Sequence, residues 1–256
     1  MAVNDSIRPG QPWLDTGGNR IHAHGGSIFY KDGTFYWYGE NKVWTWGVRC
    51  YVSDDLYNWS DLGLIIPPDT EDATSPLNPT ALLDRPHILY NARTKKFVCW
   101  AKVMGKGSQT RTVLVADKIT GPYTIVHKDM RPLGMSAGDF DLVVSRDDEK
   151  AYMFFERVHS EMICADLTDD YTDFTGCYST HFAGKAPPFV REGPAYFRRG
   201  GHIPRAVHGA GRSTPQRSFS NVLQLTDQQR LQTSEKEGPL HCARGPVARA
   251  ADECGV

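Results

Sequence analysis

The sequence lacks the features that mark several special classes of protein. No stretch approaches 18 consecutive apolar residues, so we expect no transmembrane helix. The formal net charge of −1 gives no strong field to attract nucleic acid or an anionic membrane, so neither is expected as a partner. The first residues, MAVNDSIRPGQPW, have no apolar core of a signal peptide. This predicts a cytoplasmic protein, or a secreted one if the N-terminus is incomplete.

Cysteines are few and scattered, and no two of them form a CxxC pair. The six are Cys50, Cys99, Cys164, Cys177, Cys242 and Cys254. In a chain of this length the pattern argues against a disulfide scaffold and against a zinc site. We expect reduced cysteines, no structural metal and no cofactor.

Aromatic residues almost disappear from the last part of the chain. Between His202 and Val256 the only aromatic residue is Phe219, whereas 27 of the 28 Phe, Trp and Tyr residues lie outside this segment. Residues 202–256, called the tail below, are rich in Arg, Gln, Ser, Gly and Ala and show no alternation of apolar and polar positions. Such a composition predicts disorder.

The part before the tail contains a repeat. Short β-branched or aromatic runs recur in pairs around polar turns, which is typical of β-hairpins. The runs are GSIFYKDGTFYWYGE from Gly26, PHILYNARTKKFVCWAK from Pro86, DLVVSRDDEKAYMFFE from Asp141 and GPAYFRRGG from Gly193. The first three are followed by another strand, a polar bend and a fourth strand. The repeating unit is therefore four strands in about 50–60 residues, the spacing of propeller blades.

The repeat predicts an all-β fold with three complete blades and the start of a fourth. A β-sandwich also uses short strands and frequent turns, and it is the alternative. The propeller is favoured because a sandwich does not predict a repeated hairpin with a recurring SDDLYNW-like bend. Residues 12–201 would form the propeller domain and residues 202–256 the tail.

Carboxylates precede the first strand of successive repeats. Asp84 precedes the second hairpin, Asp139 the third and Glu192 the fourth. The innermost strand of each blade lines the axis of a propeller, so three acids at equivalent places would converge. The alternative is that they only cap loops between blades. Converging carboxylates push their pKa values apart, which suits acid–base chemistry.

These segments resemble glycoside hydrolase family 43. The stretch PWLDTGGNRIHAHGGSIFYKDGTFYWYGENK, the segments DRPHILYN and SAGDFDLVV, and the REGPAYFRRGG that contains EGP carry the resemblance. It covers about residues 12–201 and is greatest to the branch of exo-β-1,3-galactanases. The resemblance implies a five-bladed β-propeller, here truncated to about three and a half blades. It also implies an inverting hydrolase that requires no metal.

The resemblance assigns roles to several residues. The acid of the family falls on Glu192, and the aspartate that raises the pKa of this acid falls on Asp139, with Asp141 as a rival. Asp84 and His24 fall on substrate-side positions, with His24 at the floor of the channel. The catalytic base has no clear match in the first blade, and in the galactanase branch it lies on a later blade. That blade would follow Gly201, where the resemblance stops. The tail is therefore interpreted as a frameshifted or otherwise aberrant translation.

A few other residues have two interpretations. His22 and His24 lie on one face of a strand and could bind a metal, but further ligands are lacking nearby. Trp44 and Trp46 could stack on a sugar ring or pack at an edge. Arg85 could brace Asp84 or contact substrate. Trp59 recurs at the bend of a blade and is expected to be structural.

The sequence leaves three functions open. The first is a hydrolase of O-glycosidic bonds in galactan- or xylan-class carbohydrates, a monomer with a carbohydrate as its partner. The second is an inactive, truncated propeller that binds sugar weakly or not at all. The third is a propeller that serves as an interaction scaffold, for which converging carboxylates are not needed.

Overall fold

The computed structural model describes most of the chain before the tail and three short segments within it. The described residues are 4–7, 10–43, 46–105, 109–145, 149–184, 191–196, 203–209, 220–225 and 241–242. Almost all regular structure in them is β-strand, as the sequence predicts. Among these residues no helix is long and apolar enough to cross a membrane.

The first three sheets are antiparallel meanders that follow the order of the chain. The first contains β1 (His24–Lys31), β2 (Thr34–Glu40), β3 (Val48–Ser53) and β4 (Ser60–Ile66). The second contains β5 (Leu83–Asn91), β6 (Lys96–Val103), β7 (Thr110–Ala116) and β8 (Thr124–Met130). The third contains β9 (Phe140–Val144), β10 (Ala151–Arg157), β11 (Glu161–Leu167) and β12 (Phe174–His181). The short 3₁₀ helices η1 (Pro79–Ala81) and η3 (Pro132–Gly134) lie between sheets.

A fourth sheet begins as predicted, and it continues with strands from the tail. β13 (Arg191–Tyr196) pairs with β14 (Ile203–Gly209), which pairs with β15 (Ser220–Leu225). β16 (His241–Cys242) pairs with β12. Three short strands therefore lie in the range 202–256, where composition predicted disorder. The rest of the tail lies outside the described residues, so its disorder and its aberrant origin remain predictions.

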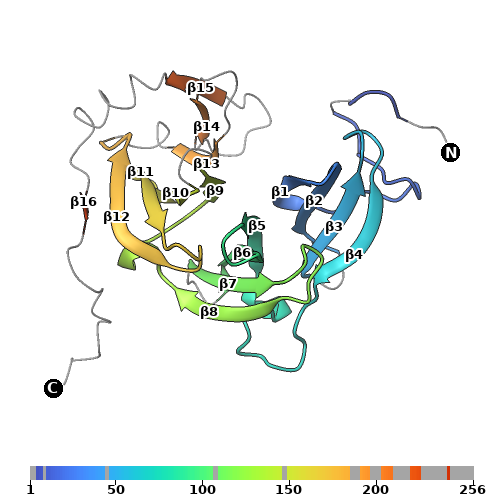
Figure 1. Cartoon of the computed structure of the whole chain (residues 1–256), viewed down its shortest axis with the longest axis horizontal. Coiled ribbons are helices and arrows are strands. Elements are labelled where there is room, and N and C mark those ends of the chain that lie inside the picture. The colour runs from blue at the N-terminus through green and yellow to red at the C-terminus, as the bar shows by residue number, and fades with distance from the viewer. Residues whose placement is uncertain are drawn as a thin grey trace.

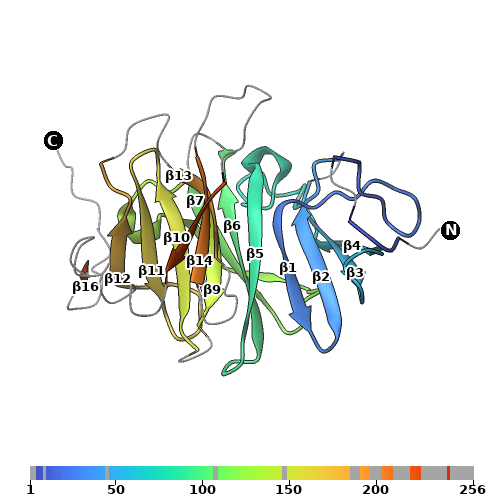
Figure 2. The same ribbon diagram turned by 90° about the horizontal axis from the view of Figure 1, so that it is seen from above.

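The sheets are arranged in an arc with their first strands innermost (Figure 1). β5 contacts β1 on one side and β9 on the other, and β9 contacts β13. Figure 2 shows β1 and β5 side by side near the middle of the molecule. This is the blade arrangement predicted from the repeat, and the described strands form an open arc.

The described core fills the spaces between the first three sheets. Trp100, Phe140 and Met153 belong to the cluster between the second and third sheets. Tyr38 and Cys99 belong to the cluster between the first and second sheets. On the first sheet, Trp59 is fully buried, as expected for a structural residue, and its indole Nε1 donates to the carbonyl of Leu56.

The cysteines differ from the sequence expectation at one position. Cys50 and Cys99 are buried free thiols, as expected. Cys177 on β12 is disulfide-bonded, so the expectation that all six cysteines are reduced is wrong there. Its partner lies outside the described side chains.

Candidate active site

The same irregularity occurs where three of the innermost strands begin. β1, β5 and β13 each have one more residue than their partner strand between two successive paired positions. The pairs are His24–Glu40 and Ser27–Tyr38, Asp84–Lys102 and His87–Trp100, and Glu192–His208 and Ala195–Ala206. Such a bulge re-aims the side chains beside it. His24, Asp84 and Glu192 therefore hold equivalent places at one end of the innermost strands.

The residue after each of these positions has a left-handed backbone. The φ angles are 59° at Gly25, 46° at Arg85 and 54° at Gly193. Glycine adopts this conformation without steric cost, whereas any other residue pays about 1 kcal/mol or more. Arg85 therefore occupies a position at which the two equivalent repeats have glycine, and its side chain must supply something that glycine cannot.

Arg85 and Lys102 hold Asp139 from two sides. Arg85 Nη2 lies 2.7 Å from Asp139 Oδ2, and Lys102 Nζ lies 3.3 Å from Asp139 Oδ1. Lys102 Nζ also lies 4.0 Å from Asp84 Oδ2. Since Lys102 is buried, with 5% of its surface exposed, its charge is poorly screened. The two predicted acids Asp84 and Asp139 are thus joined through one buried ammonium group, and Arg85 braces Asp139 rather than Asp84.

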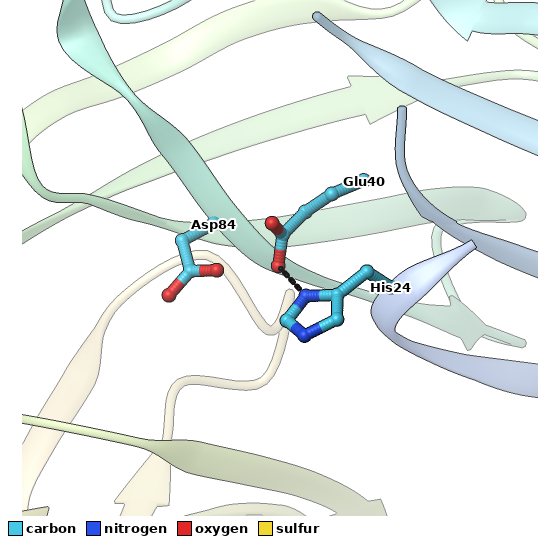
Figure 3. A group of neighbouring side chains, drawn as sticks. All are labelled: His24, Glu40 and Asp84. Carbon is cyan, nitrogen blue, oxygen red and sulfur yellow. Dashed lines mark hydrogen bonds and ion pairs between the residues drawn. The ribbon is translucent and has the colours of Figure 1, made fainter. Parts of the chain in front are cut away.

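His24, Glu40 and Asp84 form a second group of contacts (Figure 3). Glu40 ends β2 and is buried, and its Oε1 lies 3.2 Å from His24 Nδ1. The same oxygen accepts a hydrogen bond from the Arg85 amide at 3.0 Å, and Lys42 Nζ lies 3.0 Å from Oε2. Burial opposes ionisation of Glu40, but these donors and Asp84 outweigh it and lower the pKa of Glu40.

The pKa of Asp84 is shifted in the opposite direction to that of Glu40. Its burial, followed by its contact with the Glu40 carboxylate, raises its pKa to about 6. Lys102 and Arg85 act against this shift. Glu40 and Asp84 therefore titrate as a pair of unlike carboxyl groups, in which Asp84 retains its proton to the higher pH.

The carboxylate of Glu192 contacts the imidazole of His159, which also lies near Glu156. His159, in the turn between β10 and β11, places Nδ1 3.2 Å from Glu192 Oε1 and 3.8 Å from Glu156 Oε1. Glu156 is buried on β10. Its burial, and then the negative charges of Glu192 and Asp139, raise its pKa to about 7. A carboxyl group that is protonated near neutral pH therefore lies beside the predicted acid.

The rival of Asp139 has different surroundings. Asp141 is buried, its Oδ1 lies 3.3 Å from His87 Nδ1, and its Oδ2 accepts a hydrogen bond from the backbone amide of Tyr196 at 2.6 Å. Burial raises the pKa of Asp141 and lowers the pKa of His87. Asp141 thus ties β9 to β13, whereas Asp139 contacts Lys102, which also lies near Asp84.

A cavity of about 890 Å³ lies between the innermost strands. Its lining includes Arg85, His87, Asp141, Gly193 and Tyr196. It does not include Asp84, Asp139 or Glu192. The cavity is therefore adjacent to the carboxylates and is not formed by them.

Other predicted positions are not connected to the carboxylates. Trp46 lies in the loop between β2 and β3, and its carbonyl accepts a hydrogen bond from Asn41. No hydrogen bond, ion pair or ring contact of the described residues joins its side chain to the acids. Trp44 lies outside the described residues. The backbone amide of His22 donates a hydrogen bond to Tyr51 Oη. Two groups of described residues could hold a metal ion; one contains His24, and neither contains His22.

Sequence reasoning missed Glu40, Lys102 and Glu156. Each is the last charged residue of the second run in a repeat, in TFYWYGE, FVCWAK and AYMFFE. Antiparallel pairing places that position beside the start of the first strand, as in the pairs His24–Glu40 and Asp84–Lys102. The sequence did contain a signal for these residues, because a charged residue ends an otherwise apolar run in each of the three repeats. Together with the predicted acids, these positions give five carboxylates, Glu40, Asp84, Asp139, Glu156 and Glu192, connected by ion pairs and close charges.

Comparison with known proteins agrees with this geometry. The profile of glycosyl hydrolases family 43 matches residues 21–203. A family 43 β-1,3-galactosidase is 33% identical, with a TM-score of 0.75, over 87% of this chain and 49% of the other. A second one, solved with galactodeoxynojirimycin, is 26% identical, with a TM-score of 0.72, over 86% and 81%. An exo-β-1,3-galactanase from Clostridium thermocellum is 25% identical, with a TM-score of 0.70, over 85% and 51%.

No curated protein matches the chain significantly. The chain spans about half the length of the first galactosidase and of the galactanase. The matched family profile nevertheless covers most of the residues before the tail, including all the described carboxylates discussed above. The chain belongs to glycosyl hydrolases family 43.

Proposed function

We propose that the protein is a glycoside hydrolase that acts on β-1,3-linked galactose or a related plant-type glycan. The observation that carries the proposal is the set of five carboxylates at one end of the innermost strands, in a chain of family 43. Solved relatives named as β-1,3-galactosidases and an exo-β-1,3-galactanase support the choice of substrate.

Glu192 is proposed as the general acid. It is partly exposed, so it can meet a substrate, and it starts an innermost strand as Asp84 does. In an inverting hydrolase the acid protonates the leaving oxygen while a base activates water on the opposite face of the sugar. The resemblance places this base on a later blade, so the proposal assigns the general acid and not the base.

Asp139 is proposed as the residue that orients and tunes this acid. Arg85 and Lys102 hold its carboxylate, so it stays in place while Glu192 changes its protonation state. Its charge raises the pKa of Glu156, which is close to Glu192. We propose that the sugar is also contacted by Asp84, His24 and Arg85, which lie on the side of the carboxylate group away from Glu192. Trp46 would extend this binding surface.

The proposed experiment uses a chain completed to a full propeller and compares it with its Glu192→Gln variant on β-1,3-galactan, xylan and arabinan oligosaccharides. The purified 256-residue chain is measured beside them and should be nearly inactive, because its base is expected on a later blade. Glutamine keeps the size of the side chain and removes the transferable proton. A general acid contributes about 10²–10⁴-fold, so the variant should lose that factor with natural substrates and less with an activated aryl glycoside. Sugar binding, measured by calorimetry, should be retained.

Two outcomes would contradict the proposal. Turnover that is equal in the completed chain and in its Glu192→Gln variant would remove Glu192 from the acid role. Absence of both turnover and sugar binding in the folded, completed chain would favour an inactive propeller. Asp141→Asn is a useful comparison, because Asp141 is buried and ties β9 to β13. This variant should be less stable than the wild type, but its rate should depend on the leaving group as the wild-type rate does.

A further inference from the structure

The five carboxylates differ in the cations that neutralise them. Asp139 has Arg85 and Lys102, and Glu40 has Lys42. Asp84 has Lys102 at 4.0 Å. Within the described part of the chain, by contrast, Glu156 and Glu192 form no ion pair with lysine or arginine, and the group that both of them meet is the imidazole of His159.

Glu156 is also left with an unused oxygen. Its Oε2 is buried and has no hydrogen-bond partner among the described residues. Leaving a buried carboxylate oxygen without a partner costs several times the net gain of an ordinary hydrogen bond. The raised pKa of Glu156 reflects the same situation, because burial and the neighbouring Glu192 and Asp139 charges disfavour its ionised form. The charge of Lys102 acts against this shift without reversing it, so among the described residues the positive charge near Glu156 and Glu192 is insufficient.

We propose that Glu156, His159 and Glu192 bind a divalent transition-metal ion, with Zn²⁺ as the best-fitting ion. One ligand atom from each residue lies within 4.8 Å of the others, and the imidazole Nδ1 is 3.2 Å and 3.8 Å from the two carboxylates. A tetrahedral zinc ion with bonds of about 2.0–2.2 Å holds its ligands about 3.3–3.6 Å apart. Small side-chain movements therefore suffice, and a water molecule would take the fourth position.

The choice of metal follows from the donor set. One imidazole nitrogen and two carboxylate oxygens are ligands that Zn²⁺ accepts, whereas Ca²⁺ requires six to eight oxygens and Mg²⁺ a nearly octahedral set. His159 lies in the turn after β10 with a φ of 55°, and from there its Nδ1 comes within 3.8 Å of Glu156 Oε1.

The other histidine–carboxylate group is a weaker candidate for a metal. In the group of Figure 3, Glu40 already accepts from the Arg85 amide and pairs with Lys42 through its second oxygen. Asp84 has the buried Lys102 nearby. A cation there would compete with two ammonium groups. The contrast makes this group the matched control for the experiment.

Binding of Zn²⁺ would involve Glu192, so it would inhibit hydrolysis if Glu192 is the acid. That consequence rests on the proposed function, whereas metal binding does not. A folded chain, completed to a full propeller, that binds Zn²⁺ but hydrolyses nothing would uphold the metal site and overturn the proposed function. A chain that hydrolyses glycans but binds no Zn²⁺ would do the reverse.

The test is calorimetric titration of ZnCl₂ into the full chain in a buffer that does not chelate metals. We expect one site whose affinity falls by more than about tenfold in His159→Gln and in Glu156→Gln, because even outer-shell changes at metal sites cost about 10–100-fold. His24→Gln should bind as the wild type does. Circular dichroism confirms that each variant is folded, and His159 is exposed enough for its replacement to be tolerated.

Cobalt(II) absorption separates this site from cysteine ligation elsewhere in the chain. Nitrogen and oxygen ligation gives visible d–d bands without a thiolate charge-transfer band, and these bands should disappear in His159→Gln. The proposal is overturned if no saturable binding occurs, if His159→Gln binds as the wild type does, or if the spectrum shows thiolate ligation that this variant leaves intact.

Discussion

Arg85 and Asp139 form an ion pair that joins the second and third sheets, with Nη2 2.7 Å from Oδ2. The arginine reaches Asp139 from a left-handed backbone position, where two equivalent repeats have Gly25 and Gly193. The strained backbone and the ion pair therefore come from the same residue. The backbone amide of Arg85 also donates a hydrogen bond to Glu40. Arg85 therefore connects two of the five carboxylates, Asp139 through its side chain and Glu40 through its backbone.

The first prediction separates the two effects at Arg85. Arg85→Ala and Arg85→Gly both lose the ion pair, but only glycine relieves the left-handed strain. We expect the glycine variant to be more stable than the alanine variant by about 1 kcal/mol, measured from urea midpoints with equal m-values. At Arg157, whose φ is not positive, the order should reverse. An alanine variant as stable as the glycine variant at position 85 would show that the backbone there is not left-handed.

Much of the fold follows from the repeat in the sequence. The alternating runs and polar turns predicted the hairpins β1–β2, β5–β6 and β9–β10, because a period of two fixes which side chains share a face. The start of a fourth sheet at Gly193 was also predicted. The pairing of β13 with a strand from the tail was not, since Ile203–Gly209 contains a proline and few strand-forming residues by composition.

The candidate site was predicted in part. Asp84, Asp139 and Glu192 were predicted because each precedes an apolar strand at an equivalent place in successive repeats, and their catalytic and binding roles stay predictions. Lys102 and Glu156 were missed because their importance comes from pairing across a hairpin, which a search along one strand does not detect. His159 could not be predicted, since its approach to Glu192 depends on the contact between the third and fourth sheets.

The second prediction concerns the junction of the first two sheets. Tyr38 Oη accepts a hydrogen bond from the Ile88 amide at 2.8 Å and donates to the Ile88 carbonyl at 3.3 Å. Tyr38→Phe leaves a buried amide and carbonyl without their partner, so the free energy of unfolding should fall by about 1–3 kcal/mol. Tyr30→Phe is the matched control, because Tyr30 is exposed and should change little. An equal loss for both variants would contradict this role of Tyr38.

The third prediction concerns the space for Glu156. A Cβ atom on Gly138 would overlap the carboxylate of Glu156 and lie 2.6 Å from its Cγ. Gly138→Ala should therefore cost about 1–3 kcal/mol of stability, as overpacking usually does. In a Glu156→Ala background the same substitution should cost much less, because the colliding carboxylate is absent. Thermal unfolding of the four chains gives the coupling energy, and purely additive effects would show that the two residues do not touch.

The fourth prediction follows from the raised pKa of Glu156. Its pKa is about 7 in the folded chain, against an ordinary value of 4.5. Between these values the folded state binds more protons than the unfolded state, so the free energy of unfolding falls as the pH rises. The contribution is fully present below pH 4.5 and is lost as the pH passes through 7. Above that pH the wild-type chain carries a buried, poorly compensated charge.

Glu156→Gln removes this penalty, because an amide stays neutral at every pH. The stability of the variant relative to the wild type should therefore increase by about 1–3 kcal/mol between pH 4.5 and 7.5 and then level off. Urea unfolding at several pH values measures the difference, and Glu71→Gln, at an exposed glutamate, controls for the substitution itself. A difference that is constant with pH, or that decreases toward pH 7.5, would mean that Glu156 ionises in the folded chain as an ordinary glutamate does. Its position beside Glu192 would then contribute no neutral carboxyl group near pH 7.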